Sequence, residues 1–183
     1  MRKLLLAASV SLLAAPALAA PWVVDAKTSR LRFTGTQAGE VFEGGFQRFD
    51  STIDFEETAP EKGQLRIVVT MDSLEVDGKD RADALPTSDW FASKQFPTAT
   101  FTSNEIRRSG AHAYVANGTL TLRGISKPLA LPFTLTTQGT EMVASGSVTL
   151  NRSDFGIGQG RWTNETWVKN AVTVRYEIHA QRD

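Results

Sequence analysis

Apolar and polar side chains alternate with a period of two along most of this chain. Residues 65, 67, 69 and 71 are apolar, and the same alternation runs through 112–122, 128–137 and 169–181. Successive side chains of a β-strand point to opposite faces, so the pattern predicts strands that bury one face and leave the other in water. The chain is therefore constrained to an all-β fold around one apolar interior.

Eight segments carry this pattern and are expected to be strands. They are 30–37, 41–56, 64–76, 98–107, 112–122, 128–137, 141–152 and 169–181. Eight strands with one apolar face are compatible with a β-sandwich or a β-barrel. Long strands joined mostly by short connections favour an up-and-down antiparallel barrel, because a closed sheet leaves no exposed edges.

Three features interrupt the alternation. Charged and small residues gather between 77 and 97, where 79–85 is long enough for a short helix that Pro86 ends. The segment 154–169 is rich in glycine and predicts a long loop. Pro128 and Pro132 lack the N–H that a ladder needs, so they predict an edge, a bulge or a seam of the barrel in their strand.

The N-terminal residues have the pattern of an export signal. Arg2 and Lys3 precede an uncharged apolar run, 4–13, and Ala17-Leu18-Ala19 supplies the small residues that precede a cleavage site. The apolar run is shorter than the roughly 20 residues that span a bilayer. We therefore expect 1–19 to be a cleaved signal peptide, and 20–183 to be a single domain in the periplasm.

The composition disfavours several functions. Twenty basic residues balance 20 acidic ones, which gives no electrostatic reason to expect a nucleic acid partner. The chain has no cysteine and only two histidines, His112 and His179, in different predicted strands. That set lacks the spacing of a zinc site or a nucleophilic triad. We expect neither a metal site nor a catalytic residue.

The inward positions predict an apolar lumen. An eight-stranded barrel is just wide enough to be filled by side chains or to hold one slim ligand. Each inward residue taken alone is explained by ordinary core packing, but because the inward positions together carry almost no polar groups, the lumen suits an alkyl or prenyl chain. The candidate ligand-binding residues are Phe33, Phe42, Phe46, Phe55, Ile67, Val69, Trp90, Phe91, Phe101, Leu120, Leu122, Leu131, Phe133, Phe155, Trp162, Val174 and Tyr176.

Two smaller groups are expected at the mouth of such a tunnel. The aromatic side chains of Trp90, Phe91, Phe155 and Trp162 are candidate gate residues, and the alternative is that they pack loops onto the barrel rim. The charged residues expected to orient a lipid head group are Arg81, Asp83, Arg152 and Asp154, for which the alternative is a surface or structural ion pair.

An ordered set of motifs resembles the YceI-like family of periplasmic polyisoprenoid-binding proteins. It includes Ser88-Asp89-Trp90-Phe91, Gly118-Thr119-Leu120-Thr121-Leu122-Arg123-Gly124 and Arg152-Ser153-Asp154-Phe155-Gly156. The resemblance implies a lipocalin-like eight-stranded barrel, often dimeric, whose tunnel takes an isoprenoid chain such as a quinone tail or a polyprenyl phosphate. Members encoded with cytochrome b561-type membrane proteins are the most similar, which implies a quinone and such a cytochrome as partner.

The function we predict is that of a non-enzymatic carrier of an isoprenoid lipid, with no cofactor besides the bound lipid. Two alternatives stay open from the sequence. One is an accessory subunit that docks on a b561-type membrane cytochrome and whose barrel is filled by side chains. The other is an enzyme that acts on the head group of a bound lipid.

Overall fold

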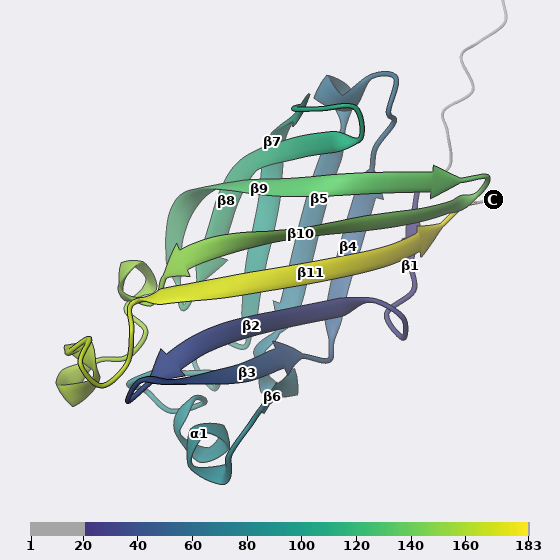
Figure 1. The fold of residues 1–183 in the computed structure, drawn as a ribbon. Coiled ribbons are helices and arrows are strands. Elements are labelled where there is room, and N and C mark those ends of the chain that lie inside the picture. The colour runs from purple at the N-terminus through teal and green to yellow at the C-terminus, as the bar shows by residue number, and fades with distance from the viewer. Residues whose placement is uncertain (1–20, 183) are drawn as a thin grey trace, which may run out of the picture.

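The computed structural model describes residues 21–182 and shows one antiparallel sheet curled strongly into a half-barrel, consistent with a lipocalin-like β-barrel (Figure 1). The predicted signal peptide lies outside the described residues. The strands are β1 (Val23–Val24), β2 (Arg30–Gln37), β3 (Glu40–Phe46), β4 (Phe49–Asp54), β5 (Gln64–Thr70), β6 (Leu74–Val76), β7 (Thr98–Arg108), β8 (Ala113–Leu122), β9 (Ile125–Gln138), β10 (Glu141–Asn151) and β11 (Ala171–Gln181). The helices are α1 (Lys79–Ala84) and the 3-10 turns η1 (Pro60–Lys62), η2 (Met71–Ser73), η3 (Arg152–Phe155) and η4 (Gly160–Thr163).

The strands follow the order β4-β5-β7-β8-β9-β10-β11-β2-β3-β6 around the sheet. From β7 to β11 each strand pairs with its sequence neighbour, as in an up-and-down meander. Strand β1 pairs with β11, and the adjacent Trp22 forms an isolated bridge with Ile53 of β4. The N-terminal segment therefore links two strands that are far apart in the order of the sheet.

The sheet of the described residues has eleven strands, so the prediction of eight was wrong. Segment 41–56 divides into β3 and β4, and segment 64–76 divides into β5 and β6. At the first break the inward residues change from even to odd numbers, from Phe46 to Phe49, and at the second from odd to even, from Met71 to Leu74. The change occurs because the strand turns a corner at each break. Side chains hold the corner, since Ser73 Oγ accepts a hydrogen bond from the Arg48 N–H at 3.0 Å. The two-residue strand β1 is the third addition.

The predicted seam lies between β9 and β10. These strands pair only from Thr134–Gln138 to Glu141–Ser145, and the pairing stops short of Pro132. The Leu135 N–H donates to His112 O at 2.8 Å on the β8 side, so the even-numbered residues of β9 face β10. Pro128 and Pro132 therefore remove N–H donors from the edge that faces β10, and of the three predicted alternatives (edge, bulge or seam) the structure has the seam.

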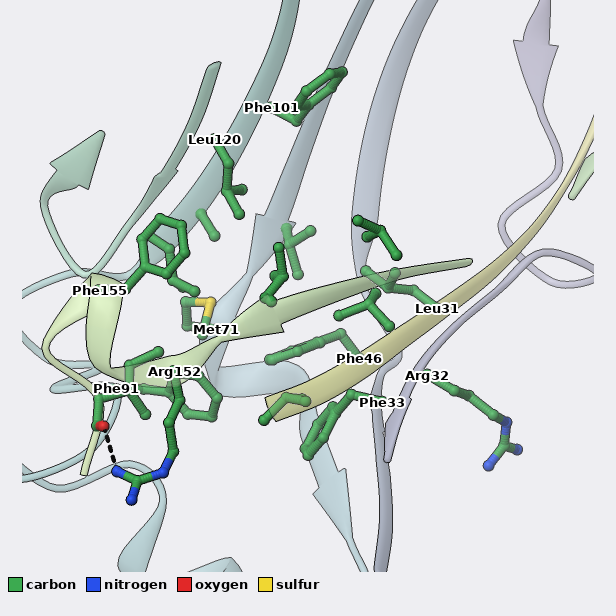
Figure 2. Close-up of a pocket in the computed structure, with 18 of the residues that line it drawn as sticks. Leu31, Arg32, Phe33, Phe46, Met71, Phe91, Phe101, Leu120, Arg152 and Phe155 are labelled. Atoms are coloured by element: carbon green, nitrogen blue, oxygen red, sulfur yellow. Dashed lines mark hydrogen bonds between the residues drawn. The ribbon is translucent and has the colours of Figure 1, made fainter. Parts of the chain in front are cut away.

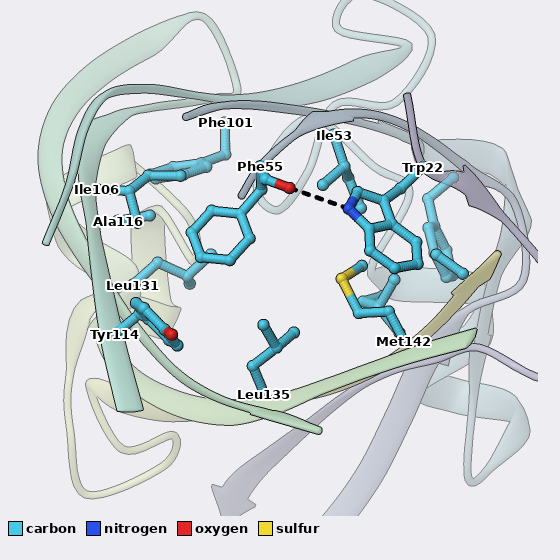
Figure 3. Packing of buried hydrophobic residues seen from close by; sticks show 13 residues of the cluster. Trp22, Ile53, Phe55, Phe101, Ile106, Tyr114, Ala116, Leu131, Leu135 and Met142 are labelled. Atoms are coloured by element: carbon cyan, nitrogen blue, oxygen red, sulfur yellow. Dashed lines mark hydrogen bonds between the residues drawn. The ribbon is translucent and has the colours of Figure 1, made fainter. Parts of the chain in front are cut away.

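One end of the half-barrel is closed by an aromatic cluster (Figure 3). Tyr114 is completely buried, and its ring stacks on Phe133 at 5.4 Å and meets the edge of Phe55 at 5.1 Å. Trp22 donates a hydrogen bond from its indole Nε1 to Phe55 O at 3.1 Å. A second cluster at the other end combines strands with loops, and it contains Phe33, Leu85, Trp90, Phe155, Ile157 and Val168.

Candidate ligand-binding cavity

A cavity of about 200 Å³ lies inside the sheet between the two clusters (Figure 2). Inward side chains of β2 to β5 and of β7 to β11 contribute to its wall. The wall is almost entirely apolar, and Arg32, which borders the cavity, directs its guanidinium away from it. Such a wall provides burial for hydrocarbon and few hydrogen bonds for a sugar or nucleotide.

Inward glycines allow the aromatic rings to lie along the wall. Phe33 pairs across the ladder with Gly44, and Phe42 pairs with Gly35. A Cβ atom on Gly44 would lie 2.5 Å from the Phe33 ring, and one on Gly35 would lie 2.6 Å from the Phe42 ring. Each ring therefore occupies the space of its neighbour's missing side chain instead of crossing the lumen. Short and long residues in facing positions thus keep the cavity open.

A smaller cavity of about 50 Å³ lies deeper in the half-barrel, toward the aromatic cluster of Tyr114. Its wall is again apolar, with Ser51 as its polar exception. The two cavities share four lining residues, which are Ile67, Leu131, Tyr176 and Ile178. These four residues mark the boundary between the two cavities.

The four predicted gate residues gather at the end of the main cavity that the loops cover. Trp90 and Phe155 are buried, Phe91 is half-buried, and all three line the cavity. Trp162 does not line it but packs on Trp90 with ring centroids 5.6 Å apart. Trp162 therefore packs a loop onto the rim, the alternative given above for these residues, whereas the other three reach the lumen.

Arg152 organises the loop that follows β10. It is only 5% exposed, and its guanidinium lies 5.7 Å from the Trp90 ring. All five N–H donors bind backbone carbonyls, those of Ile157, Gly158, Trp162, Val168 and Lys169. Burial lowers the pKa of Arg152 below its usual value. With every donor used by the chain, Arg152 has none left for a lipid head group, and its role in this structure is to hold the loop.

The other predicted head-group residues lie in different settings. Arg81 of α1 stacks on the Phe42 ring at 4.7 Å and donates from Nε to Gln37 Oε1 at 2.7 Å, which places its charge beside a wall residue of the cavity. Asp83 forms an exposed ion pair with Lys79 at 2.6 Å, as the surface alternative predicts. Asp154 is exposed on η3. Of these groups, Arg81 is the one whose position suits a ligand at the mouth.

Most of the predicted ligand-binding residues line the cavities. Phe55 and Phe133 face the deeper one, and Trp162 faces neither. The main cavity is lined by the other fourteen, namely Phe33, Phe42, Phe46, Ile67, Val69, Trp90, Phe91, Phe101, Leu120, Leu122, Leu131, Phe155, Val174 and Tyr176. That they contact a ligand stays a prediction.

Sequence reasoning left out two kinds of lining residue. Strand parity already marked Leu31, Val148 and Ile178 as inward, and a complete parity count would have added them. Leu85, Ile157 and Val168 come from loops, where no periodicity shows which way a side chain points. Only the folded chain brings that second group to the lumen.

The histidine, aspartate and glutamate side chains of the described residues are scattered. Within 21–182 no group of three His, Asp or Glu side chains is arranged to hold a metal ion. His179 lies on the outer face of β11, where Nε2 is 2.9 Å from Glu177 Oε1, and His112 is exposed at the turn before β8. The same part of the chain contains no helix long and apolar enough to cross a membrane.

The chain is similar in sequence to UPF0312 proteins of several bacteria. It is 30% identical to a UPF0312 protein of Photorhabdus laumondii over 130 residues, 67% of each chain, and 28% identical to one of Pseudomonas savastanoi over 171 residues, 88% of this chain and 89% of that protein. The match with a UPF0312 protein of Pseudomonas aeruginosa, at 32% identity, spans 62% of each chain.

Solved structures share the fold. The crystal structure of Burkholderia cenocepacia BcnA is 26% identical, with a TM-score of 0.83 over 86% of this chain and 99% of that one. A polyisoprenoid binding domain from Saccharophagus degradans, 15% identical, has a TM-score of 0.68 over 90% of this chain and 99% of that one, a likeness of fold alone. The YceI-like domain model matches residues 22–180, and the chain therefore belongs to the YceI-like family.

Proposed function

We propose that this protein binds and carries a long-chain isoprenoid lipid, with the chain held in the main cavity and the head group at the loop-covered end. The observation that carries the proposal is the main cavity of about 200 Å³ with an almost wholly apolar wall, inside a strongly curled sheet. The Saccharophagus degradans domain of the same fold is a polyisoprenoid binding domain, which supports an isoprenoid as the ligand class.

The energetics of such a site favour binding through the chain. Each buried methylene contributes about 0.8 kcal/mol, and the wall supplies apolar contacts on all sides. Association costs on the order of 4–15 kcal/mol in lost freedom, so a chain of about fifteen buried carbons offsets most or all of that cost. The apolar wall therefore accounts for affinity without a strong polar anchor.

The head group is proposed to lie near Trp90 and Arg81. The Trp90 side chain is 7% exposed, and its indole Nε1 has no hydrogen-bond partner among the described residues. A buried donor without a partner is unfavourable, and an acceptor oxygen of a ligand would satisfy it. Quinone carbonyls and phosphates both supply such oxygens, and the proposal includes both a prenyl quinone and a polyprenyl phosphate.

Two further statements belong to this proposal. The pattern of residues 1–19 supports export to the periplasm, where the lipid would be carried. The open lumen favours a carrier over a docking subunit of a b561-type cytochrome, because that alternative requires a barrel filled by side chains. The fold and family are those of binding proteins, and we propose a non-catalytic role.

The test is native mass spectrometry of the protein purified from its producing cells, followed by organic extraction of the bound material. The proposal predicts a stoichiometric isoprenoid lipid, or uptake of added prenyl quinone or polyprenyl phosphate by the emptied protein. A protein that is empty as isolated and refuses both added lipids would contradict the proposal.

A matched pair of variants tests whether the lipid lies in the cavity. Val148 lines the main cavity from β10, whereas its neighbour Thr149 is exposed on the outer face. Val148→Trp fills the lumen and is expected to abolish lipid uptake, while Thr149→Trp adds the same ring outside and is expected to leave uptake unchanged. Equal uptake by the two variants would place the lipid elsewhere.

A further inference from the structure

The ring of Tyr176 lies where the two cavities meet. Along β11, Val172 and Val174 line only the main cavity, whereas Tyr176 and Ile178 line both. Along β10 the order is the same, since Val148 belongs to the main cavity and Ala144 to the deeper one, with Gly146 between them. The level of Tyr176 is therefore the level at which the lumen divides.

Tyr176 reaches across one strand to a second. Gly146 of β10 is its ladder partner, and a Cβ atom on that glycine would lie 2.6 Å from the Tyr176 Oη. Past Gly146 the hydroxyl donates a hydrogen bond to the Pro132 carbonyl of β9. The ring thus lies over β10 and is held at both ends, by its own strand and by β9.

The seam explains why the Pro132 carbonyl is available. Pairing of β9 with β10 ends at Thr134 and Ser145, and Pro132 lies just past that point. A carbonyl that faces β10 there does not take part in the ladder, and the Tyr176 hydroxyl satisfies it. The hydrogen bond between Tyr176 and Pro132 therefore lies where β9 and β10 are not paired. Because this bond is not part of the ladder, it can break while the ladder stays intact.

We propose that Tyr176 sets the length of lipid chain that the main cavity accepts, and that the deeper cavity receives the end of a longer chain when the ring moves. This inference rests on the proposed function. A chain that enters from the loop-covered end meets Tyr176, together with Ile67, Leu131 and Ile178, before it can reach the deeper space. Of these four boundary residues, Tyr176 is the one held by a side-chain hydrogen bond among the described residues.

The first experiment measures affinity for geraniol, farnesol, geranylgeraniol and their longer homologues. In the unmodified protein affinity rises with each isoprene unit until the chain end reaches Tyr176, and then stays constant. We call the chain length at which affinity stops rising the limiting length. Tyr176→Ala is expected to increase the limiting length by about one isoprene unit and to raise affinity for the next longer alcohol about tenfold or more.

Val174→Ala is the matched control, because Val174 lies two residues earlier on the same face of β11 and lines only the main cavity. It is expected to weaken all chain lengths beyond its position by one common factor and to leave the limiting length in place. The inference is wrong if both variants move the limit equally or if Tyr176→Ala leaves it unchanged. If the unmodified protein binds no prenyl chain at all, the proposed function itself fails.

A second experiment needs no variant. A prenyl alcohol of the limiting length, with a photoreactive diazirine at its far end, is bound to the unmodified protein and cross-linked. Label on Tyr176, Ile178, Ile67 or Leu131 is the expected result. Label on residues that line only the deeper cavity, such as Phe55 or Met142, would overturn the inference, because the chain would then pass Tyr176 freely.

Discussion

The Phe33 ring lies over Gly44, its partner across the β2–β3 ladder, so that a Cβ atom on Gly44 would lie 2.5 Å from Cζ of that ring. Phe42 and Gly35 repeat the arrangement, and Tyr176 and Gly146 repeat it between β11 and β10. Flexible aromatic side chains would otherwise fill the lumen. The inward glycines are therefore as important to the cavity as the residues that line it.

Gly44→Ala is expected to destabilise the protein by about 1–3 kcal/mol, because the added methyl group forces Phe33 or the neighbouring backbone to move. If Phe33 turns into the lumen, lipid uptake falls as well. Urea unfolding measures the first effect and lipid titration the second. Ser147→Ala, on the exposed face of β10, is the control and is expected to change stability by about 0.5 kcal/mol or less. Equal stability of the two variants would contradict the packing described above.

Arg152→Met is expected to destabilise the protein by about 2–4 kcal/mol. The substitution keeps much of the buried volume but leaves five backbone carbonyls without their donors. The loop 152–169 then loosens, and trypsin cleaves faster at Arg161. Arg107→Met, which removes only an exposed pair with Glu105, is the control for unfolding in urea. Unchanged stability and cleavage in Arg152→Met would show that the loop is held in another way.

Arg81→Met is expected to weaken the binding of a polyprenyl phosphate about tenfold or more, since a charge-assisted hydrogen bond contributes about 1.5–3 kcal/mol. A prenyl alcohol of the same chain length should lose less than about twofold. Asp83→Asn is the control, because Asp83 pairs with Lys79 in solvent. Titration of both lipids with all three proteins makes the measurement. Equal losses for phosphate and alcohol would show that Arg81 acts through packing on Phe42 and not through its charge.

The two tyrosines of the chain should not ionise near pH 10 while the protein is folded. Burial raises the pKa of Tyr176, and burial with the Glu57 carboxylate raises the pKa of Tyr114. Because both pKa values are higher in the folded state, the unfolded chain releases these protons first. The stabilisation is complete below about pH 10 and is lost as the pH rises through the folded-state values.

Tyrosinate absorbance and circular dichroism, recorded together as the pH is raised, test this expectation. Absorbance should rise only as the β signal disappears, and in Tyr176→Phe the remaining change should come from Tyr114 alone. Reversible ionisation of either tyrosine near pH 10, with the sheet intact, would show that its hydroxyl is open to water.

Parity predicted most of the cavity wall but not its boundaries. The alternation around Ile67 and Val174 shows which side chains face inward, because a strand has a strict period of two. It does not show that Phe46 and Phe49 lie on either side of a corner, since a corner leaves apolar residues on both sides and only shifts their parity. Two of the three additional strands arise at such corners, and the two-residue strand β1 is the third.

The charged residues show a second limit of the sequence. Arg152 and Arg81 were equivalent candidates as long as only their neighbours in the chain were known. The fold buries Arg152 among five carbonyls and places Arg81 on the Phe42 ring, because loops from distant positions meet at one end of the sheet. Contacts of this kind have no period and leave no trace in the local sequence.

The sequence by itself determined the all-β class, the apolar face of each strand and an interruption of the ladder at Pro128 and Pro132, since these depend on side-chain period and on backbone N–H groups. The tertiary structure decided which aromatic rings lie along the wall, where the lumen divides at Tyr176, and which cation stays at the mouth. Those outcomes depend on strand register and curl, which bring together residues such as Tyr176 and Pro132 from separate strands, and register is set only when the whole sheet forms.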